Sequence, residues 1–389
     1  MKILIASDLH YPTINGVATF SRSLAKGLAD RGHEVLVIAP SQTGKKGTEV
    51  DGNYTIARTM SVPVVFYQNL RVSLSPGYEV KKIIEGFKPD VMHIQTPMLI
   101  CQAVMKYGNK HGIPVVSTNH GMPENIIDNL PMLLPVAKPV TQFLNNYGTR
   151  LHAKADYVTL PTQSAIDMFR ASEKLTVPLE AISNGIDLAH FTKGSAPTAL
   201  YKKFSIPKGV PIVSYVGRID AEKHLPVLLK AFTRVLIDIP KAHLLIVGDG
   251  TEVEPLRAQA KRLRIAEQVT LTGRVTDKEL VALHKMGTVF CMPSPAELQS
   301  IATLEAMASG LPVVAVDAGA LRELCQHERN GYLCKQDNDK EIAERLIQVI
   351  SNKKLRNTFG TESLTIAGTH DIKTTLERFE AIYRSLAKT

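Results

Sequence analysis

The chain has 389 residues, of which 44% are hydrophobic and 21% are charged, as in an ordinary soluble globular protein. This length exceeds that of one ordinary core, so we expect two domains of roughly 150–200 residues each. The net charge of +9 favours anionic partners, but neither a zinc-ligand spacing nor an RNP-like aromatic motif accompanies it. Nucleotide phosphates and an anionic membrane surface are therefore favoured, and nucleic acid is not expected as a partner.

Cysteine usage and apolar segments indicate the compartment. Cys101 and Cys291 lie in apolar surroundings and are interpreted as small buried hydrophobes. Cys325 and Cys334 could approach each other, but a reducing cytoplasm is the simpler interpretation. The apolar run at residues 3–6 is too short for a signal peptide, and no segment approaches the ~20 apolar residues of a membrane span. We expect a cytoplasmic protein whose membrane contact is peripheral, on the inner face of the cell membrane.

Short apolar strands alternate with helices in the first half of the chain. The spacing of Phe20, Leu24 and Leu28 predicts a helix at residues 17–31, and a second helix is predicted at residues 81–87. Strands are predicted at residues 2–7, 33–40, 90–94, 114–118, 156–160 and 179–183. This alternation favours a parallel sheet that is covered on both faces.

The alternation restarts after a polar stretch at residues 187–209. Strands are predicted at residues 210–216, 243–247, 268–272, 288–292 and 313–316, with helices at 225–239 and from residue 340, where Ile342, Leu346 and Ile350 share one face. The predicted fold class is α/β, with two Rossmann-like doubly wound domains facing across a cleft. The first domain is expected at residues 1–190 and the second at 191–389, with the option that the last helix crosses back. The absence of GxGxxG and Walker A sequences counts against dehydrogenases and P-loop enzymes.

The stretch at residues 294–310 carries the most information about function. Glu297 and Glu305 stand astride a predicted helix start, with Ser300 as the N-cap and Gly310 at the stop. Backbone amides near Ser300 and Ile301 would be free to bind an anion. A sugar nucleotide, with its hydroxylated ring, diphosphate and ribose, would find a partner for each part. The alternative is an ordinary buried helix face with two incidental glutamates.

A basic segment at residues 217–223 follows the first strand of the second half. Arg218 and Lys223 would stand at the strand end, where a diphosphate leaving group needs positive charge. The alternative is a solvated loop in which Glu222 pairs with Lys223, or Asp220 with Arg218.

Other strand ends carry weaker signals. Gly248 permits close approach after one strand, and the main chain at Arg274 and Val275 could read a nucleobase edge after the next. In the first half, Gly16 lies in the loop after the first strand, and His120 ends another strand. The alternatives are plain turns, a helix start and a structural histidine.

Five features together resemble the family 4 retaining glycosyltransferases of the GT-B fold, and the resemblance covers essentially the whole chain. They are the loop at Gly16, His120, the Asn-Gly-Ile-Asp at residues 184–187, the segment 217–223, and Glu297 and Glu305 followed by Ala-Met-Ala-Ser-Gly. The resemblance implies that the first domain faces acceptor and membrane and that the second binds the nucleotide sugar.

The resemblance also implies residue roles on the donor. Glu297 would bind the donor sugar hydroxyls, Glu305 the ribose hydroxyls, and the amides of Ser300 and Ile301 the distal phosphate. These residues, with Gly16, Gly248, Arg274 and Val275, complete the predicted donor site around the two cations.

The catalytic residues implied are His120, Arg218, Lys223 and Glu297. Arg218 and Lys223 would neutralise the departing diphosphate, and His120 would contact the sugar near the reacting centre. No metal is needed in the family, and no cofactor is expected besides the nucleotide sugar, which is a co-substrate. Configuration would be retained by front-face attack assisted by the leaving group, and no double-displacement nucleophile can be assigned.

Two departures from many relatives favour one branch of the family. Gln299 and Ser300 replace Phe-Gly, and His224 replaces Gly, a form that resembles the lipid-glycosylating branch. An apolar run beside a lysine at residues 132–138 suits a membrane-facing surface. A second aromatic and basic neighbourhood comprises Phe66, Tyr67, Arg71, Lys81 and Lys82.

The sequence therefore predicts transfer of a hexose, preferably from UDP-glucose, to a membrane lipid hydroxyl such as that of diacylglycerol. The alternatives are a GDP-mannose-dependent enzyme acting on phosphatidylinositol or polysaccharide, a UDP-sugar epimerase, and a non-catalytic sugar-nucleotide-binding subunit. Donor base, hexose, acceptor and oligomeric state stay open.

Overall fold

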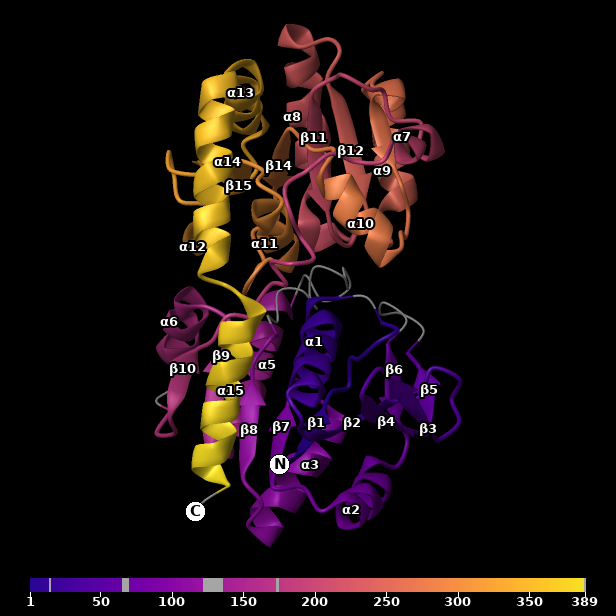
Figure 1. Ribbon diagram of the computed structural model, residues 1–389, viewed down its shortest axis with the longest axis vertical. Coiled ribbons are helices and arrows are strands. Elements are labelled where there is room, and N and C mark those ends of the chain that lie inside the picture. The colour runs from indigo at the N-terminus through magenta and orange to yellow at the C-terminus, as the bar shows by residue number, and fades with distance from the viewer. Residues whose placement is uncertain (14, 65–69, 122–135, 173–174, 388–389) are drawn as a thin grey trace. The chain divides into compact units, whose positions relative to one another are not determined.

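The structure, a computed structural model, describes residues 1–13, 15–64, 70–121, 136–172 and 175–387 (Figure 1). The chain forms two compact units. Unit 1 comprises Met1–Gly185 and Lys373–Thr389, and unit 2 comprises Ile186–Ile372.

Unit 1 is built on one extended sheet. In spatial order its strands are β10 (Leu179–Ala181), β9 (Tyr157–Leu160), β8 (Val115–Thr118), β7 (Val91–Ile94), β1 (Lys2–Ala6), β2 (Glu34–Pro40), β4 (Tyr54–Thr59) and β3 (Gly47–Asp51). All neighbouring pairs are parallel except β3 and β4. The predicted parallel sheet is therefore confirmed, and one antiparallel strand, β3, is added at its edge, where Gly52 closes a tight turn with a φ of 63°. A short antiparallel ribbon joins β5 (Ser61–Pro63) to β6 (Arg71–Ser73).

The helices of unit 1 come from both ends of the chain. They are α1 (Gly16–Asp30), α2 (Pro76–Phe87), α3 (Leu99–His111), α5 (Ala137–His152), α6 (Gln163–Ser172) and α15 (Ile372–Leu386). The predicted apolar face of α1 is buried, and its Phe20 ring lies 5.9 Å from that of Phe379 on α15. A Cβ at Gly27 of α1 would come within 2.4 Å of Leu376, so a glycine lets α15 pack directly against α1.

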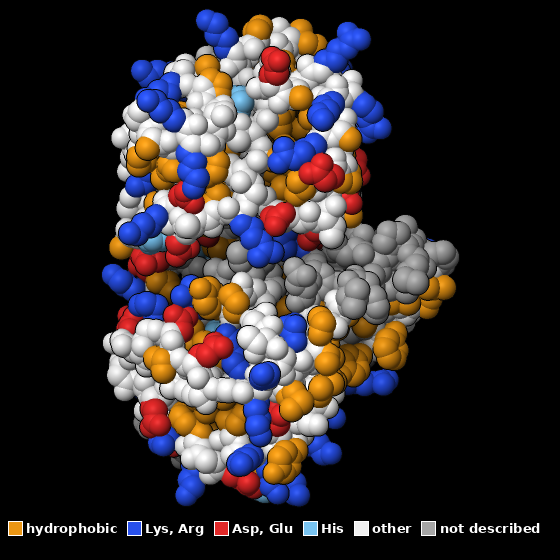
Figure 2. Space-filling model, turned by 90° about the vertical axis from the view of Figure 1, so that its right-hand side faces the viewer, with side chains coloured by type: hydrophobic (Ala, Val, Ile, Leu, Met, Phe, Trp, Pro, Cys, Tyr) orange, Lys and Arg blue, Asp and Glu red, His pale blue; other side chains and the backbone are white. Residues whose placement is uncertain are grey.

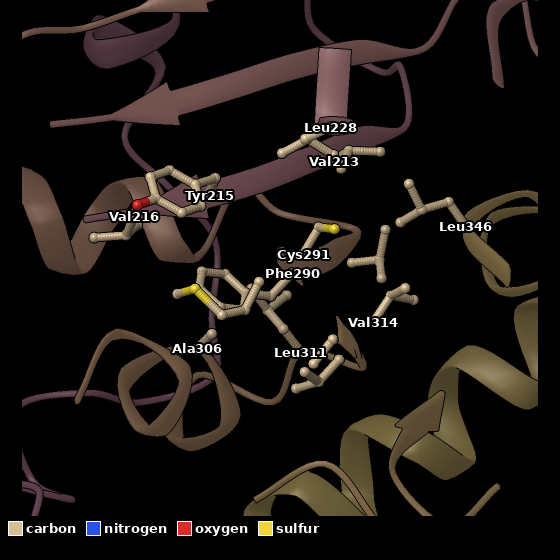
Figure 3. Close-up of a cluster of buried hydrophobic side chains, with 14 of the residues drawn as sticks. Val213, Tyr215, Val216, Leu228, Phe290, Cys291, Ala306, Leu311, Val314 and Leu346 are labelled. Atoms are coloured by element: carbon tan, nitrogen blue, oxygen red, sulfur yellow. The ribbon is translucent and has the colours of Figure 1, made fainter. Parts of the chain in front are cut away.

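Unit 2 contains a fully parallel sheet. Its order is β13 (Val269–Leu271), β12 (His243–Val247), β11 (Ile212–Val216), β14 (Val289–Met292), β15 (Val313–Val316) and β16 (Gly331–Cys334). Its helices are α7 (Thr198–Lys203), α8 (Leu225–Asp238), α9 (Val253–Arg262), α10 (Asp277–His284), α11 (Ile301–Ala308), α12 (Leu321–Leu324), α13 (Asp339–Ser351) and α14 (Lys353–Gly368), with short 3₁₀ turns at Ala221–Lys223 and Ala266–Gln268. Figure 3 shows the core of this unit, in which Tyr215, Phe290 and Leu346 are fully buried between sheet and helices.

Most predicted elements are found within two residues of their expected bounds. The strands at 243–247 and 313–316 match, and Ile342, Leu346 and Ile350 are buried on α13 as expected. The helix predicted at 81–87 begins earlier, at Pro76, because proline at a first helical turn needs no backbone N–H.

The chain crosses from one unit to the other twice, near residues 186 and 372. Backbone hydrogen bonds join these two segments within unit 2. The N–H of Ile186 donates to the carbonyl of His370 at 2.8 Å, and the N–H of Ile372 donates back to Ile186 at 3.0 Å. Residues 373–389 therefore belong to unit 1 although they follow unit 2 in sequence.

Two further sequence expectations concern thiols and membrane spans. All four cysteines are free and buried, including Cys101 and Cys291, which confirms those two as buried hydrophobes. Among the helices that the structure describes, none combines the length and apolar character that crossing a bilayer requires.

Candidate active site

The two most specific sequence motifs meet at one place in unit 2. Strands β11 and β14 are neighbours at the centre of the sheet, and the strand order reverses between them. Residues 217–223 follow β11, and residues 293–300 follow β14. Open α/β sheets bind ligands outside the carboxyl ends of their strands at such a reversal. The fold therefore brings both motifs to the position where a ligand is expected.

Lys223 and Glu297 form an ion pair across this position. Lys223 Nζ lies 2.8 Å from Glu297 Oε1, and their side chains are only 11% and 13% exposed. The 3₁₀ turn Ala221–Lys223 presents the lysine, and it ends at His224, which has a φ of 49°. Because both charges are largely removed from water, each depends on the other when no ligand is bound.

Arg218 is held by two acidic side chains. Its guanidinium donates to Asp220 Oδ2 at 2.5 Å and also to Glu222. Asp220 and Glu222 are buried, so this is not the solvated surface pair that the sequence left open. The phenol of Tyr215 donates to the carbonyl of Arg218 at 2.8 Å, and burial beside Glu297 and Glu222 raises the pKa of that phenol well above its usual value.

Helix α11 begins as the sequence predicts. Ser300 is the N-cap, and its hydroxyl accepts from the N–H of Thr303 at 3.3 Å. Within the described residues, the N–H groups of Ser300 and Ile301 donate to no protein acceptor. The loop before the helix is fixed, because the carbonyl of Glu297 accepts from the N–H of Ala320 at 3.2 Å. Two free amides beside a fixed carboxylate suit a phosphate next to a hydroxylated ring.

Glu305 lies one turn inside α11, as predicted, and has a partner that sequence reasoning missed. His284, the last residue of α10, lies with Nε2 at 3.2 Å from Glu305 Oε2, and the imidazole is fully buried. A lone histidine in an amphipathic segment carried no signal of this contact. The pair leaves the second carboxylate oxygen of Glu305 for another partner.

The turn after β12 packs against the backbone at the start of the segment 217–223. A Cβ at Gly248, where φ is 147°, would lie 1.8 Å from the carbonyl oxygen of Gly217, so the predicted close approach is to protein backbone. Arg274 and Val275 follow β13, two strands from β11, and Arg274 forms an exposed ion pair with Asp249 at 3.2 Å. Their contact with a nucleobase stays a prediction.

Unit 1 carries the two remaining predicted residues. Gly16 is the first residue of α1, whose N-cap Asn15 accepts from the N–H of Ala18 at 2.8 Å. One turn later, the ring of Phe20 lies 4.9 Å from that of His120. α1 therefore brings the Gly16 end of the helix towards the histidine.

His120 itself is half-buried and neutral. Its Nε2 lies 2.9 Å from Oε1 of Gln95, a residue that sequence reasoning missed although it also ends a strand. Burial, with a smaller contribution from His152, lowers the pKa of His120 to about 3. The imidazole can therefore accept or donate one hydrogen bond at neutral pH but cannot act as a charged acid.

The described part of the chain holds no group of three or more His, Cys, Asp or Glu arranged to bind a metal ion. The site in unit 2 offers two cations, two free amides and two glutamates within adjoining segments. This set can bind a diphosphate and hydroxyl groups and can stabilise a leaving phosphate electrostatically.

Comparison with known proteins identifies the family. Residues 198–364 match the model described as Glycosyl transferases group 1, and residues 14–190 match Glycosyltransferase Family 4.

Two curated relatives and one solved structure cover most of the chain. The alpha-monoglucosyldiacylglycerol synthase of Streptococcus pneumoniae is 27% identical over 87% of this chain and 76% of its own length. A GDP-mannose-dependent alpha-mannosyltransferase of Mycolicibacterium smegmatis is 30% identical over 87% of this chain and 85% of its own. The structure of Anabaena Alr3699/HepE in complex with UDP and glucose is 20% identical, covers 99% and 100% of the two chains, and has a TM-score of 0.78. The chain therefore belongs to the family 4 retaining glycosyltransferases, and its two Rossmann-like units have the GT-B fold.

Proposed function

We propose that this glycosyltransferase moves a hexose, preferably from UDP-glucose, to a membrane lipid hydroxyl such as that of diacylglycerol, without a metal or other cofactor. The observation that carries the donor half is the Lys223–Glu297 pair beside the free amides of α11. The acceptor half draws on the names of the relatives and on the surface of α5. Glycosyl transfer itself follows from membership of the family, and the proposal adds the donor and the acceptor.

The donor has a partner for each of its parts in unit 2. Glu297 exchanges its lysine partner for the hydroxyls of the hexose, and Lys223 turns to the diphosphate. Ser300 and Ile301 donate their N–H groups to the distal phosphate, whose charge is favoured at a helix N-terminus. Glu305, held by His284, accepts from the ribose hydroxyls.

The chemical step needs charge stabilisation more than proton transfer from a side chain. The acceptor oxygen bonds to the anomeric carbon as the bond from that carbon to the phosphate oxygen breaks. The departing phosphate oxygen takes the acceptor's proton on the same face, so configuration is retained. Arg218 and Lys223 stabilise the charge that grows on the diphosphate.

Exposed aromatic side chains on α5 support a lipid surface. Phe143 is 68% exposed and Tyr147 is 37% exposed, and their rings stack with centroids 6.4 Å apart. Lys138 and Arg150 are exposed on the same helix. In the lower half of Figure 2, hydrophobic side chains gather along one edge of unit 1, with Lys and Arg beside them. An apolar stripe with flanking cations suits the interface of an anionic membrane.

The structure describes only part of the other segments that are predicted to face the membrane. Residues 132–135 of the apolar run, and Phe66 with Tyr67, lie outside the described residues. Arg71 donates to the Ser61 hydroxyl and carbonyl, both at 3.0 Å, so it is used within unit 1.

A second candidate is a GDP-mannose-dependent enzyme that glycosylates phosphatidylinositol or a polysaccharide. The relative at 30% identity has a GDP-mannose-dependent activity in its name, which favours this candidate. A non-catalytic sugar-nucleotide-binding subunit is disfavoured because both cations and both glutamates of the predicted site are present.

A donor and acceptor screen tests the proposal. Purified protein with EDTA would be given UDP- and GDP-hexoses with and without vesicles containing diacylglycerol, and the products would be identified by mass spectrometry. A glycosylated diacylglycerol from UDP-glucose alone supports the proposal. A mannosylated product from GDP-mannose would support the second candidate function instead. Donor hydrolysis without a lipid product would indicate that the acceptor is a soluble sugar or polymer.

A further inference from the structure

Gln95 stands at the strand reversal of unit 1, beside the predicted catalytic histidine. The sheet order reverses between β1 and β7, and Gln95 directly follows β7. Its N–H donates to the carbonyl of Ala6 at the end of β1, at 3.0 Å, and its side chain is fully buried. Strand β8, which ends just before His120, lies on the other side of β7. Gln95 is therefore fixed between the strand that leads to the Gly16 loop and the strand that leads to His120.

The contact between Gln95 and His120 defines which ring nitrogen carries the hydrogen. A carboxamide oxygen can only accept, so the 2.9 Å contact to Gln95 Oε1 requires His120 Nε2 to donate. A neutral imidazole carries one N–H, and Nδ1 therefore presents a lone pair. Within the described residues His120 makes no other hydrogen bond. The ring is held from one side by Phe20 at 4.9 Å.

The nitrogen of the Gln95 carboxamide is a hydrogen-bond donor without an acceptor among the described residues. The Nε2 of Gln95 is buried and has no hydrogen-bond partner among the described residues. A buried amide donor without a partner is destabilising, and an apolar side chain of the same shape would avoid that cost. Stability alone therefore does not explain a glutamine at this position. The hydrogen bond that its oxygen accepts from His120 does explain it.

We infer that Gln95 is a positioning residue for glycosyl transfer, which fixes His120 as the Nε2–H tautomer so that Nδ1 accepts a hydrogen bond from a hydroxyl of the transferred hexose. This inference rests on the proposed function for the identity of the ligand. Gln95 acts only through His120 and touches no substrate. The arrangement favours sugars with a hydroxyl at that position over deoxy analogues, because the lone pair of Nδ1 would otherwise lose its donor.

The tautomer can be measured without any substrate. Long-range ¹H–¹⁵N spectra of histidine-labelled protein would be recorded, with His120 assigned from the His120→Gln variant. The wild type and Gln95→Glu, which keeps the accepting oxygen, should show the Nε2–H form. Gln95→Met should show a mixture or the other tautomer, and Gln163→Met, the same change at an exposed position of unit 1, should leave the signal unchanged. An Nδ1–H form in the wild type, or an unaltered signal in Gln95→Met, overturns the inference.

Kinetics separate positioning from a merely structural role. Gln95→Met should lower kcat on the order of tenfold, the effect of one misplaced hydrogen bond, while KM for the nucleotide sugar changes much less. Gln95→Glu should recover most of the rate. UDP affinity should be unaffected because its proposed partners lie in unit 2, and an unchanged His10 signal in the same spectra would show that unit 1 remains folded. A loss of rate that Gln95→Glu fails to restore, with the tautomer unchanged, refutes the inference. A wild type that transfers no sugar refutes the proposed function alone, since the tautomer is read independently.

Discussion

Lys223 and Glu297 neutralise each other at a distance of 2.8 Å although 74 residues separate them in the chain. They meet because β11 and β14 are adjacent and each residue lies in the segment that follows its strand. The cation expected to meet the diphosphate and the carboxylate expected to meet the sugar are thus partners when no donor is bound. A nucleotide sugar can replace both halves of this ion pair at once, whereas a free nucleoside diphosphate replaces only one.

Lys223→Ala should lower the rate of the chemical step by about 10²–10³-fold, because charge on the leaving phosphate grows in the transition state. Single-turnover kinetics at saturating donor would measure this step. Lys230→Ala, an exposed lysine on α8, is the matched control. A single-turnover rate equal to that of the wild type would exclude Lys223 from charge stabilisation.

Glu297→Gln should separate binding from transfer. The variant leaves Lys223 without its charged partner, so we expect tighter binding of UDP, by a few-fold to about tenfold. Transfer should nevertheless fall, because a neutral amide binds sugar hydroxyls more weakly than a carboxylate. Calorimetric titration with UDP would test the expected gain in affinity, and the transfer assay would test the expected loss of rate. Weaker UDP binding would show that the ion pair does not compete with the diphosphate.

Glu305→Ala should weaken binding of the nucleotide by about tenfold to a hundredfold, the range for hydrogen bonds to a charged group. The rate at saturating donor should change less, because the ribose is remote from the reacting carbon. The donor dissociation constant is the measurement, with Glu254→Ala on α9 as an exposed control. An unchanged constant would remove Glu305 from the ribose site.

Unit 1 should lose stability as the pH falls from 7 to 5. Burial lowers the pKa of His93, His10 and His120 to about 3 and that of His152 to about 4. The unfolded chain binds protons at these residues below about pH 6.5 and the folded chain does not, so their contribution is complete above that pH and is lost towards pH 3. For fully buried His93 the loss by pH 5 is about 2 kcal/mol.

Denaturant unfolding at pH 7 and pH 5 would measure this loss. In unit 1, hydrogen bonds from arginine lower the pKa of Asp51, Glu180 and Glu380, so these carboxylates lose their contribution mainly below about pH 5. Burial raises the pKa of Asp8, which acts with the opposite sign, and the comparison of wild type with variant cancels both effects. The His93→Gln variant should show a smaller difference between the two pH values. An equal difference in the variant and the wild type would mean that His93 is not held neutral by folding.

Phe143→Glu should reduce binding to anionic vesicles severalfold or more, because it replaces an exposed aromatic ring with a negative charge. Vesicle co-sedimentation would measure it, with UDP affinity as the check that unit 2 is intact. Ile237→Glu is the matched control, since Ile237 is 76% exposed but lies on α8 of unit 2. Equal effects of the two variants would argue against α5 as the membrane-facing surface.

The sequence reveals the fold where burial imposes a simple pattern. The central strands are continuous apolar runs because both faces of a parallel sheet are covered, and β12 and β15 were predicted to the residue. The β3 strand was missed because it is polar and mostly exposed at a sheet edge. The attachment of α15 to unit 1 depends on contacts of Phe379 with Phe20 and of Tyr383 with His93, which lie far apart in the sequence and which no local pattern encodes.

The site shows the same division. Ser300 as an N-cap and Glu305 inside the helix follow from local rules, so both were predicted. The pairing of Lys223 with Glu297 requires the strand order, and His284 carried no signal at all. Gln95 could have been found, since it follows a strand as His120 does, but a glutamine carries no charge or titratable group that marks it for attention.

The return of α15 to unit 1 sets the order in which this protein can be completed during synthesis. The hydroxyl of Tyr383 contacts buried His93 at 2.6 Å, and Phe379 covers Phe20 of α1. Neither contact can form until all of unit 2 has been synthesised, because α15 follows unit 2 in the sequence. Unit 2 is continuous and can fold first, although it is translated later than most of unit 1. A nascent chain stalled before residue 373 would therefore lack the cover that α15 gives to Phe20 and Gly27 of α1, and that intermediate is where chaperones and proteases would act.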